Sequence, residues 1–491
     1  MVVRKNKIPI SFSTILIAVI VILISVGFLI VSGGNVAAAM VPTFVYLAVI
    51  ALFNAPLKYS VMTLYGAALL LTSSGETPHE GKWRGPFTLV GDFLFGNISN
   101  LTGISPLKIS AIQIALFTFL FIIFLRTLLN NNLDGHLDLK AARSLKIAAF
   151  GALLAVSFST VRGILRGGDT SIMPLQMSTL AFCALSYIAC MRAFKDEQMY
   201  PVYAKMLVGI SILRIAEGAW YYFSMLKPSG LDYEYVMTHD DSFGFAGAIM
   251  LLVITAIEKN NIRSLLSLLG FGGIILWGSA INDRRVCYVA MGACVITLYF
   301  FLAPQVRKKI NKISMYLLPA VFLYIGVGMN SGSKIFAPVH AFTSVSDSTD
   351  PSTLSRKVEN INLIHTISGN PVIGTGFGFP YKEIIPSFKL GYEWYRYLAH
   401  NHLLWLSYIM GGVGLFFLFS PLMVTIFLAV RVYRFAQTPQ QRIVSLMAIC
   451  SVIIYLVMAF GDMGAISLKG ILLLTSTGAM VANLSRKLKA I

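Results

Sequence analysis

The sequence is short of charged residues, and acidic residues are the scarcest among them. Asp and Glu number 21 in 491 residues, and the charged types together make up 12% of the chain, against about 25% in soluble proteins. This shortage excludes an ordinary soluble globular protein. Instead, 56% of the residues are hydrophobic, and apolar runs of roughly 17–25 residues, long enough to cross a bilayer, recur along the chain. The sequence therefore predicts an all-α polytopic membrane protein.

Cysteine is absent from the polar segments. The five cysteines all fall inside predicted membrane helices, at Cys183, Cys190, Cys287, Cys294 and Cys450. Because none lies in a polar loop, the sequence supports neither a disulfide framework nor a zinc motif.

The scarcity of acids leaves a net charge of +18. In a soluble protein, this excess would indicate nucleic acid as a partner. In a membrane protein, Lys and Arg anchor the cytoplasmic loops, so we expect membrane lipids as partners and no nucleic acid. The N-terminal apolar run, residues 8–32, is longer than a signal-peptide core and is predicted to be the first membrane helix.

About fourteen membrane helices are predicted, at residues 8–32, 36–53, 57–72, 107–129, 144–160, 172–194, 206–224, 242–257, 265–281, 286–303, 313–329, 400–430, 443–460 and 466–484. The Lys and Arg of the short loops place both termini in the cytoplasm and the long loops 73–106 and 330–399 outside. About twelve spans remain possible if two short segments are re-entrant. We expect one integral membrane domain, made of helices in 1–329, an external loop with short helices in 330–399, and the last helices in 400–491.

Arginines gather at the outward ends of the predicted helices. A charge inside a span costs roughly 2.5–3.5 kcal/mol and therefore usually marks function. Arg214 lies inside a span, three residues before Glu217, and either pairs with it structurally or binds an anion from an outward cavity. A guanidinium suits phosphate because its planar fork donates two hydrogen bonds, whereas single arginines also anchor lipid headgroups. The other outward candidates are Arg162, Arg166, Arg284, Arg285, Arg356 and Arg396.

Two histidines flank an asparagine just before a predicted helix, at His400, Asn401 and His402. Histidine accepts a proton near neutral pH and so suits a base that activates a hydroxyl. A helix-capping or interfacial histidine is the alternative. The glycine-rich segment 374–378 lacks the G-x-G-x-x-G spacing of a dinucleotide site and is predicted to form turns.

The long external loop is predicted to become ordered towards its end. The tract 344–355, SVSDSTDPSTLS, is predicted to be flexible. The segment KVENINLIHTI that follows has apolar residues at helical spacing and is predicted to lie on the bundle as a short helix, with the apolar positions Val358, Ile361, Ile364 and Ile367. Glycines in the next helix are predicted to permit close helix packing, at Gly411, Gly412 and Gly414.

Together these segments resemble the bacterial O-antigen ligase and polymerase superfamily. The resemblance rests on a basic residue with a short helix, N-P-x-x-G-x-G-F-G, a polar segment, H-N-x-x-L and a G-x-x-G-L helix, at Arg356, Asn370, Pro371, Gly374, Gly376, Phe377, Gly378, His400, Asn401, Leu404, Gly411, Gly414 and Leu415. Only His400, and not His402, fits H-N-x-x-L. Residues 239–253 and the segment NDRRVCY also resemble family segments, and the latter leaves the choice between Arg284 and Arg285 open.

The resemblance implies a metal-independent, inverting glycosyltransferase of the C-type membrane fold, without a cofactor, in the bacterial inner membrane. It would act in lipopolysaccharide or surface polysaccharide biosynthesis, with its active site facing the periplasm. Its donor would be a glycan on undecaprenyl pyrophosphate. Its acceptor would be lipid A core, a protein or a lipid-linked repeat, so ligase and polymerase both stay open.

The resemblance also implies roles for the site residues. His400 would deprotonate or orient the acceptor hydroxyl, and Asn401 would hold the acceptor or the histidine. Arginines would stabilise the charge that develops on the pyrophosphate, drawn from Arg285, Arg356, Arg284, Arg214 and Arg162. A flippase or transporter of lipid-linked sugars is the alternative function, because arginines lining a cavity would suit it too.

Overall fold

The computed structural model describes residues 12–31, 33–72, 85–96, 110–128, 143–230, 236–302, 304–331, 336, 338–340, 351–387 and 395–488. The regular elements in these ranges are helices, as expected where the backbone has to satisfy its own hydrogen bonds inside a bilayer. Those of the first half are α1 (Phe12–Val31), α2 (Val36–Asn54), α3 (Leu57–Leu70), α4 (Pro86–Phe95), α6 (Ala111–Leu128), α7 (Arg143–Leu165), α8 (Met173–Ala193), α9 (Met199–Tyr221) and α10 (Lys227–Ser229).

The second half continues the helical pattern and adds a helix in the long loop. Its elements are α11 (Asp241–Lys259), α12 (Ile262–Ser267), α13 (Gly273–Asn282), α14 (Arg285–Phe301), α15 (Pro304–Gly328), α17 (Pro351–Ser368), α18 (His402–Phe435), α19 (Pro439–Gly461) and α20 (Leu468–Lys487). Short π-helical segments join α9 to α10 and α12 to α13, at Tyr222–Leu226 and Leu268–Gly272.

Eight helical runs among the described residues are long and apolar enough to cross a membrane. They are α7, α8, α9 with α10, α11, α12 with α13, α18, α19 and α20. Shorter apolar stretches lie in α1, α6, α14 and α15. Every helix predicted from the sequence overlaps a helix of the structure. The chain is therefore an all-α, multi-pass membrane protein.

The centre of the bundle is formed by α18, α19, α20 and α11. α18 packs against α7, α19 and α20, and α11 packs against α19 and α9. α20 is almost wholly buried although it carries Thr475, Ser476 and Thr477. The hydroxyl of Thr477 lies 2.6 Å from that of Ser451 on α19. Small polar side chains of this kind join helices closely inside an apolar bundle.

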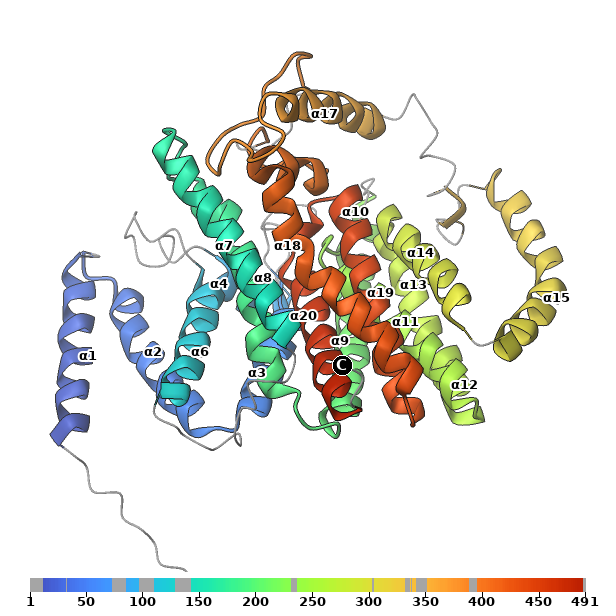
Figure 1. Ribbon diagram of the computed structural model, residues 1–491, viewed down its shortest axis with the longest axis horizontal. Coiled ribbons are helices and arrows are strands. Elements are labelled where there is room, and N and C mark those ends of the chain that lie inside the picture. The colour runs from blue at the N-terminus through green and yellow to red at the C-terminus, as the bar shows by residue number, and fades with distance from the viewer. Residues whose placement is uncertain are drawn as a thin grey trace, which may run out of the picture.

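Figure 1 shows α17 lying across one end of the bundle, beside the start of α18. We call this the α17 end. The helix begins at Pro351, so the last residues of the tract predicted to be flexible are helical, while residues 344–350 lie within a segment outside the described residues.

The buried face of α17 is mainly polar, with Glu359, Asn362 and Thr366 buried beside Leu363, which corrects the predicted apolar face. Ile361 and Ile364 are 43% and 58% exposed, whereas Asn362 is fully buried. The side-chain oxygen of Asn362 accepts the main-chain N–H groups of Ile384 and Ile385, each at 3.0 Å. α17 thus holds the irregular segment after it through side-chain hydrogen bonds, which satisfy buried main-chain groups.

The glycine-rich segment is joined to α18 through its main chain. Gly411 interrupts α18 with φ 65° and ψ 179°, a conformation essentially restricted to glycine. The carbonyls of Tyr408 and Ile409 accept the N–H groups of Thr375 and Gly376 at 2.8 and 2.9 Å. Gly411 therefore does more than permit close packing, because it breaks the helix and opens its carbonyls to the loop.

Candidate functional site

A cavity of about 400 Å³ lies at the α17 end, among the starts of α11, α14 and α18, the end of α19 and the turn before α20. Its lining includes five ionisable side chains, His239, Asp240, Arg284, His400 and Asp462. Each belongs to a segment next to a helix terminus, where the chain leaves the apolar bundle. Groups of both signs around one space are able to bind an anion and to move protons.

His400 is held at this cavity by Glu359 of α17. Nδ1 of His400 lies 3.4 Å from Oε1 and 3.3 Å from Oε2 of Glu359, and the main-chain N–H of His400 donates to Oε2 at 3.0 Å. Glu359 is buried. A carboxylate that accepts the Nδ1 proton leaves the lone pair of the neutral ring on Nε2. The arrangement therefore suits His400 as a base.

The two neighbours of His400 in the sequence have structural contacts. Asn401 is the N-cap of α18, and its side-chain oxygen accepts the N–H of Leu404 at 3.2 Å. His402 is fully buried, and its Nδ1 accepts the N–H of Ala465 at 3.1 Å. Its ring also lies against that of Trp405. Of these neighbouring residues, His400 is the one that lines the cavity.

His239 forms a second histidine–carboxylate pair in the cavity. Its Nδ1 contacts Oδ2 of Asp462, the residue after α19. The N–H of Met463 donates to Oδ1 of Asp462 at 2.9 Å, and Arg356 donates to the carbonyl of Gly461 at 2.8 Å. Burial acts to raise the pKa of Asp462, but the hydrogen bond and charge of His239, the charge of Arg356 and the Met463 N–H outweigh it and lower this pKa.

Arg284 and Arg285, which the sequence left as alternatives, have different positions. Arg284 lies in extended backbone just before α14 and lines the cavity. Arg285 is the first residue of α14 and is exposed, and it is not among the residues that line the cavity. The geometry favours Arg284 as the cavity cation.

Arg214 lies in a buried cluster of charges and does not line the cavity. Its Nε and Nη2 donate to the two carboxylate oxygens of Asp241 at 3.0 and 2.8 Å, and it also pairs with Glu217. Lys469 donates to Asp241 at 2.6 Å. Two cations and two anions offset one another here, as buried charges require. The geometry therefore favours the structural alternative for Arg214.

Arg162 holds the glycine-rich loop instead of lining the cavity. Its Nε donates to the carbonyl of Gly374 at 2.9 Å, and Arg166, one turn further along, donates to that of Thr375 at 3.2 Å. Gly376 packs closely on Gly163 of α7, because a Cβ added to Gly376 would lie only 2.5 Å from the main-chain nitrogen of Gly163. Arg162 thus belongs to the junction of α7 with the loop, away from its expected place beside an anion.

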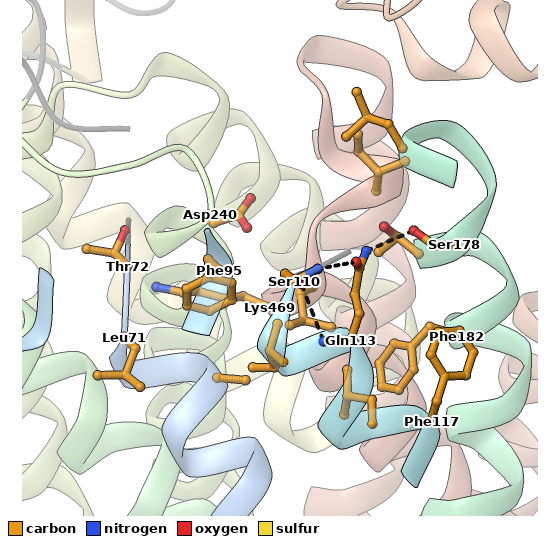
Figure 2. A pocket seen from close by; sticks show the side chains of 17 residues that line it. Leu71, Thr72, Phe95, Ser110, Gln113, Phe117, Ser178, Phe182, Asp240 and Lys469 are labelled. Atoms are coloured by element: carbon orange, nitrogen blue, oxygen red, sulfur yellow. Dashed lines mark hydrogen bonds between the residues drawn. The ribbon is translucent and has the colours of Figure 1, made fainter. Parts of the chain in front are cut away.

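A second pocket of about 250 Å³ adjoins the cavity, and both are lined by Asp240 and Ile466. Its walls are mainly apolar side chains of α3, α6 and α8. Figure 2 shows Phe117 and Phe182 on the side of this pocket away from Asp240. Phe117 and Leu175 are 40% and 41% exposed, so the apolar lining continues onto the outer surface of the bundle.

Asp240 lies where the two spaces meet. Burial raises its pKa, while the charge of Lys469 and a hydrogen bond with Ser467 act in the opposite direction. Because the effect of burial is the largest, a negative charge on Asp240 is less stable here than it would be in water.

Sequence reasoning missed Glu359, His239 and Asp462. Glu359 was hidden because it lies 41 residues from His400, on a helix whose apolar face was expected to be buried. Asp462 carries a signal in the sequence, since it is an acid just after a long apolar run. His239 is next to Asp240 in a segment whose only sequence signal is its resemblance to a family segment.

Comparison of the chain with protein-family models finds no matching family, and comparison with curated proteins finds no matching sequence. The function therefore has to be argued from the residues and geometry of the site.

Proposed function

We propose that the protein is a glycosyltransferase of the O-antigen ligase or polymerase type. It moves a glycan from undecaprenyl pyrophosphate onto an acceptor sugar hydroxyl, at the periplasmic face of a bacterial inner membrane, with both termini in the cytoplasm. One observation carries the proposal: the His400–Glu359 pair and Arg284 meet in a cavity of about 400 Å³ that adjoins an apolar pocket. A base, a cation and a space for a lipid chain are what this reaction needs.

His400 is the base in this proposal. Nε2 takes the proton of the acceptor hydroxyl as its oxygen attacks the anomeric carbon of the donor. The glycosyl–phosphate bond breaks on the opposite side, so the anomeric configuration inverts. Glu359 contributes by holding Nδ1, which keeps the ring oriented and its basic nitrogen available.

Arg284 and Arg356 serve the leaving pyrophosphate. Negative charge grows on the pyrophosphate as the bond to the sugar breaks, and a fixed guanidinium stabilises it. Arg284 lines the cavity. Arg356 does not line it, but it donates to the carbonyl of Gly461, the residue before Asp462 of the lining, and so lies at its edge. The charge of Arg356 lowers the pKa of Asp462, which supports a short distance between these two side chains.

The adjoining pocket suits the lipid part of the donor. Its walls are mainly apolar, it meets the polar cavity at Asp240, and its lining reaches the outer surface at Phe117 and Leu175. A polyprenyl chain that approaches from the bilayer would find an apolar surface that leads to the polar cavity. This supports a lipid-linked donor over a soluble sugar nucleotide.

The flippase alternative is less well supported. Both spaces lie near helix termini at the α17 end. Ion pairs lie at the opposite helix termini: Arg442 of α19 is bonded to Glu258 of α11 at 2.5 Å, and Lys487 of α20 is bonded at 2.5 Å to Glu197 in the turn between α8 and α9. A flippase needs a path that opens to both sides of the membrane, whereas a transferase needs a cavity at one side.

The proposal is tested with the full-length protein in vesicles that contain a lipid-linked glycan donor and acceptor. We expect glycan transfer by the wild type and loss of transfer in His400→Ala. The matched control is His365→Ala, because His365 is an exposed histidine of α17 and does not line the cavity. Transfer that survives in His400→Ala would remove His400 from the reaction.

The acceptor is tested by glycan analysis of a deletion strain. Single-repeat glycans on the acceptor would identify a polymerase, because chain extension alone would be lost. Accumulated long chains on the lipid carrier would identify a ligase, because the chains would be made but not transferred.

A further inference from the structure

Two histidine–carboxylate pairs line one cavity, and the reaction proposed above uses one of them. His400 pairs with Glu359, and His239 pairs with Asp462. Both carboxylates are buried, with 4% and 8% of their side chains exposed, while the imidazoles are 22% and 48% exposed. In each pair, therefore, the acid is fixed in the protein and the histidine is accessible to a ligand.

We propose that His239, held by Asp462, is the general acid that serves the leaving pyrophosphate, opposite His400 as the base. The inference rests on the proposed function and deepens it. It assigns to each histidine one of the two proton transfers that the reaction allows, so that the cavity gains no net charge when the glycan moves.

The step balances in atoms and charge. The acceptor oxygen forms a bond to the anomeric carbon and gives its proton to Nε2 of His400. The bond between that carbon and the pyrophosphate oxygen breaks, its electron pair stays on the oxygen, and protonated His239 gives this oxygen a proton. His400 then releases its proton to water and His239 takes one from water, so no further reactant is needed.

The charges around His239 suit an imidazolium that meets a pyrophosphate. Two acids line the cavity beside His239: Asp240, its neighbour in the sequence, and Asp462 after α19, which it contacts directly. Arg284 before α14 and His400 before α18 line the same cavity, and the guanidinium of Arg284 attracts the pyrophosphate. Arg356 of α17 acts on Asp462 and Lys469 of α20 acts on Asp240, but neither lines this cavity, and Lys469 is bonded to Asp241. The direct contact with Asp462 keeps Nδ1 of His239 on the carboxylate and directs proton donation to Nε2.

The test measures the pH profile of glycan transfer and the binding of undecaprenyl pyrophosphate. Full-length wild type, His239→Gln, His239→Lys and the control His365→Gln are placed in vesicles with the lipid-linked glycan extracted from cells that lack this protein. Turnover is followed from about pH 5 to 9. Binding of undecaprenyl pyrophosphate alone is measured at about pH 6 and 8.5, on either side of the ordinary titration of histidine.

We expect the turnover of the wild type to fall at both ends of the pH range. In His239→Gln, kcat should fall by about 100-fold and the decline at high pH should disappear. The same variant should bind undecaprenyl pyrophosphate about 10-fold more weakly at pH 6. His239→Lys should restore binding at both pH values, because lysine stays cationic.

Two results would overturn the inference alone. The first is that the turnover of His239→Gln still declines at high pH. The second is that His239→Gln binds undecaprenyl pyrophosphate at pH 6 as tightly as the control His365→Gln does. A wild type that neither transfers glycan nor binds undecaprenyl pyrophosphate would overturn the proposed function, and the inference with it.

Discussion

The carboxylate of Glu359 accepts the main-chain N–H of His400 at 3.0 Å, and its other oxygen lies 3.4 Å from Nδ1 of the same residue. One side chain of α17 thus fixes both the backbone and the ring of the candidate base. α17 in turn is attached to the following segment through Asn362. The orientation of His400 therefore depends on how α17 sits on the bundle.

Glu359→Gln should lower turnover and leave substrate affinity unchanged. The amide still accepts the N–H of His400 but no longer holds the Nδ1 proton with a charge, so kcat should fall about 10- to 100-fold, as for other residues that orient a functional side chain. Steady-state kinetics in vesicles separate kcat from KM. Glu383→Gln is the control, since Glu383 accepts the N–H of Ser387 and does not line the cavity. A rise in KM alone would contradict the orienting role.

Arg284→Ala and Arg285→Ala should differ sharply although the residues are neighbours. Arg284 lines the cavity and Arg285 is exposed at the start of α14. We expect the first change to reduce glycan transfer by about 10²–10³-fold, the usual effect of removing a group that stabilises developing charge. The second should stay near wild type. Equal losses in the two variants would show that the cavity cation has been misassigned.

Gly411→Ala should destabilise the protein much more than Gly412→Ala. A Cβ on Gly411 would lie 2.4 Å from the carbonyl oxygen of Val372, and its φ is 65°, whereas a Cβ on Gly412 finds its nearest neighbour at 3.6 Å. The first change should cost about 1–3 kcal/mol, and the second should stay within about 1 kcal/mol. Thermal unfolding in detergent compares the two. A similar loss in both would mean that α18 is not interrupted at Gly411.

Asp462→Asn should destabilise the protein at neutral pH and have little effect in acid. Because the pKa of Asp462 is lowered in the folded state, its contribution to stability is present above the unfolded value of about 3.9 and is lost as the pH falls through that value towards the folded pKa. At pH 7, the loss should be about 1.5–3 kcal/mol, as for a hydrogen bond to a charged group. Unfolding of the two proteins is compared from pH 7 downwards. A difference that stays constant into acid would exclude this cause.

The helices were predictable from the sequence because the length of an apolar run is a local property. Each predicted segment overlaps a helix, and the choice of His400 over His402 agrees with the cavity lining. The proposed chemistry remains a prediction, since neither the fold nor the comparisons test it.

What was not predictable depends on contacts between distant segments. Hydrophobicity predicts an apolar buried face for α17, but beside Leu363 its buried side chains are polar ones that hydrogen-bond to other segments, as Asn362 does. The partner of His400 could not be found by spacing because Glu359 lies on another helix. Arg162 and Arg214 were grouped with the cavity by residue type and helix end, and only their hydrogen bonds to Gly374 and Asp241 separate them from it.

The main-chain junction between the glycine-rich loop and α18 limits how the chain can be recombined. The N–H groups of Thr375 and Gly376 reach carbonyls of α18, and the carbonyl of Gly378 accepts the N–H of Asp169 at 2.8 Å. A residue inserted between Thr375 and Gly378 would shift one set of contacts against the other. A chimera that borrows α17 from another chain therefore has to keep the length of this segment, together with its glycines and the buried Phe377.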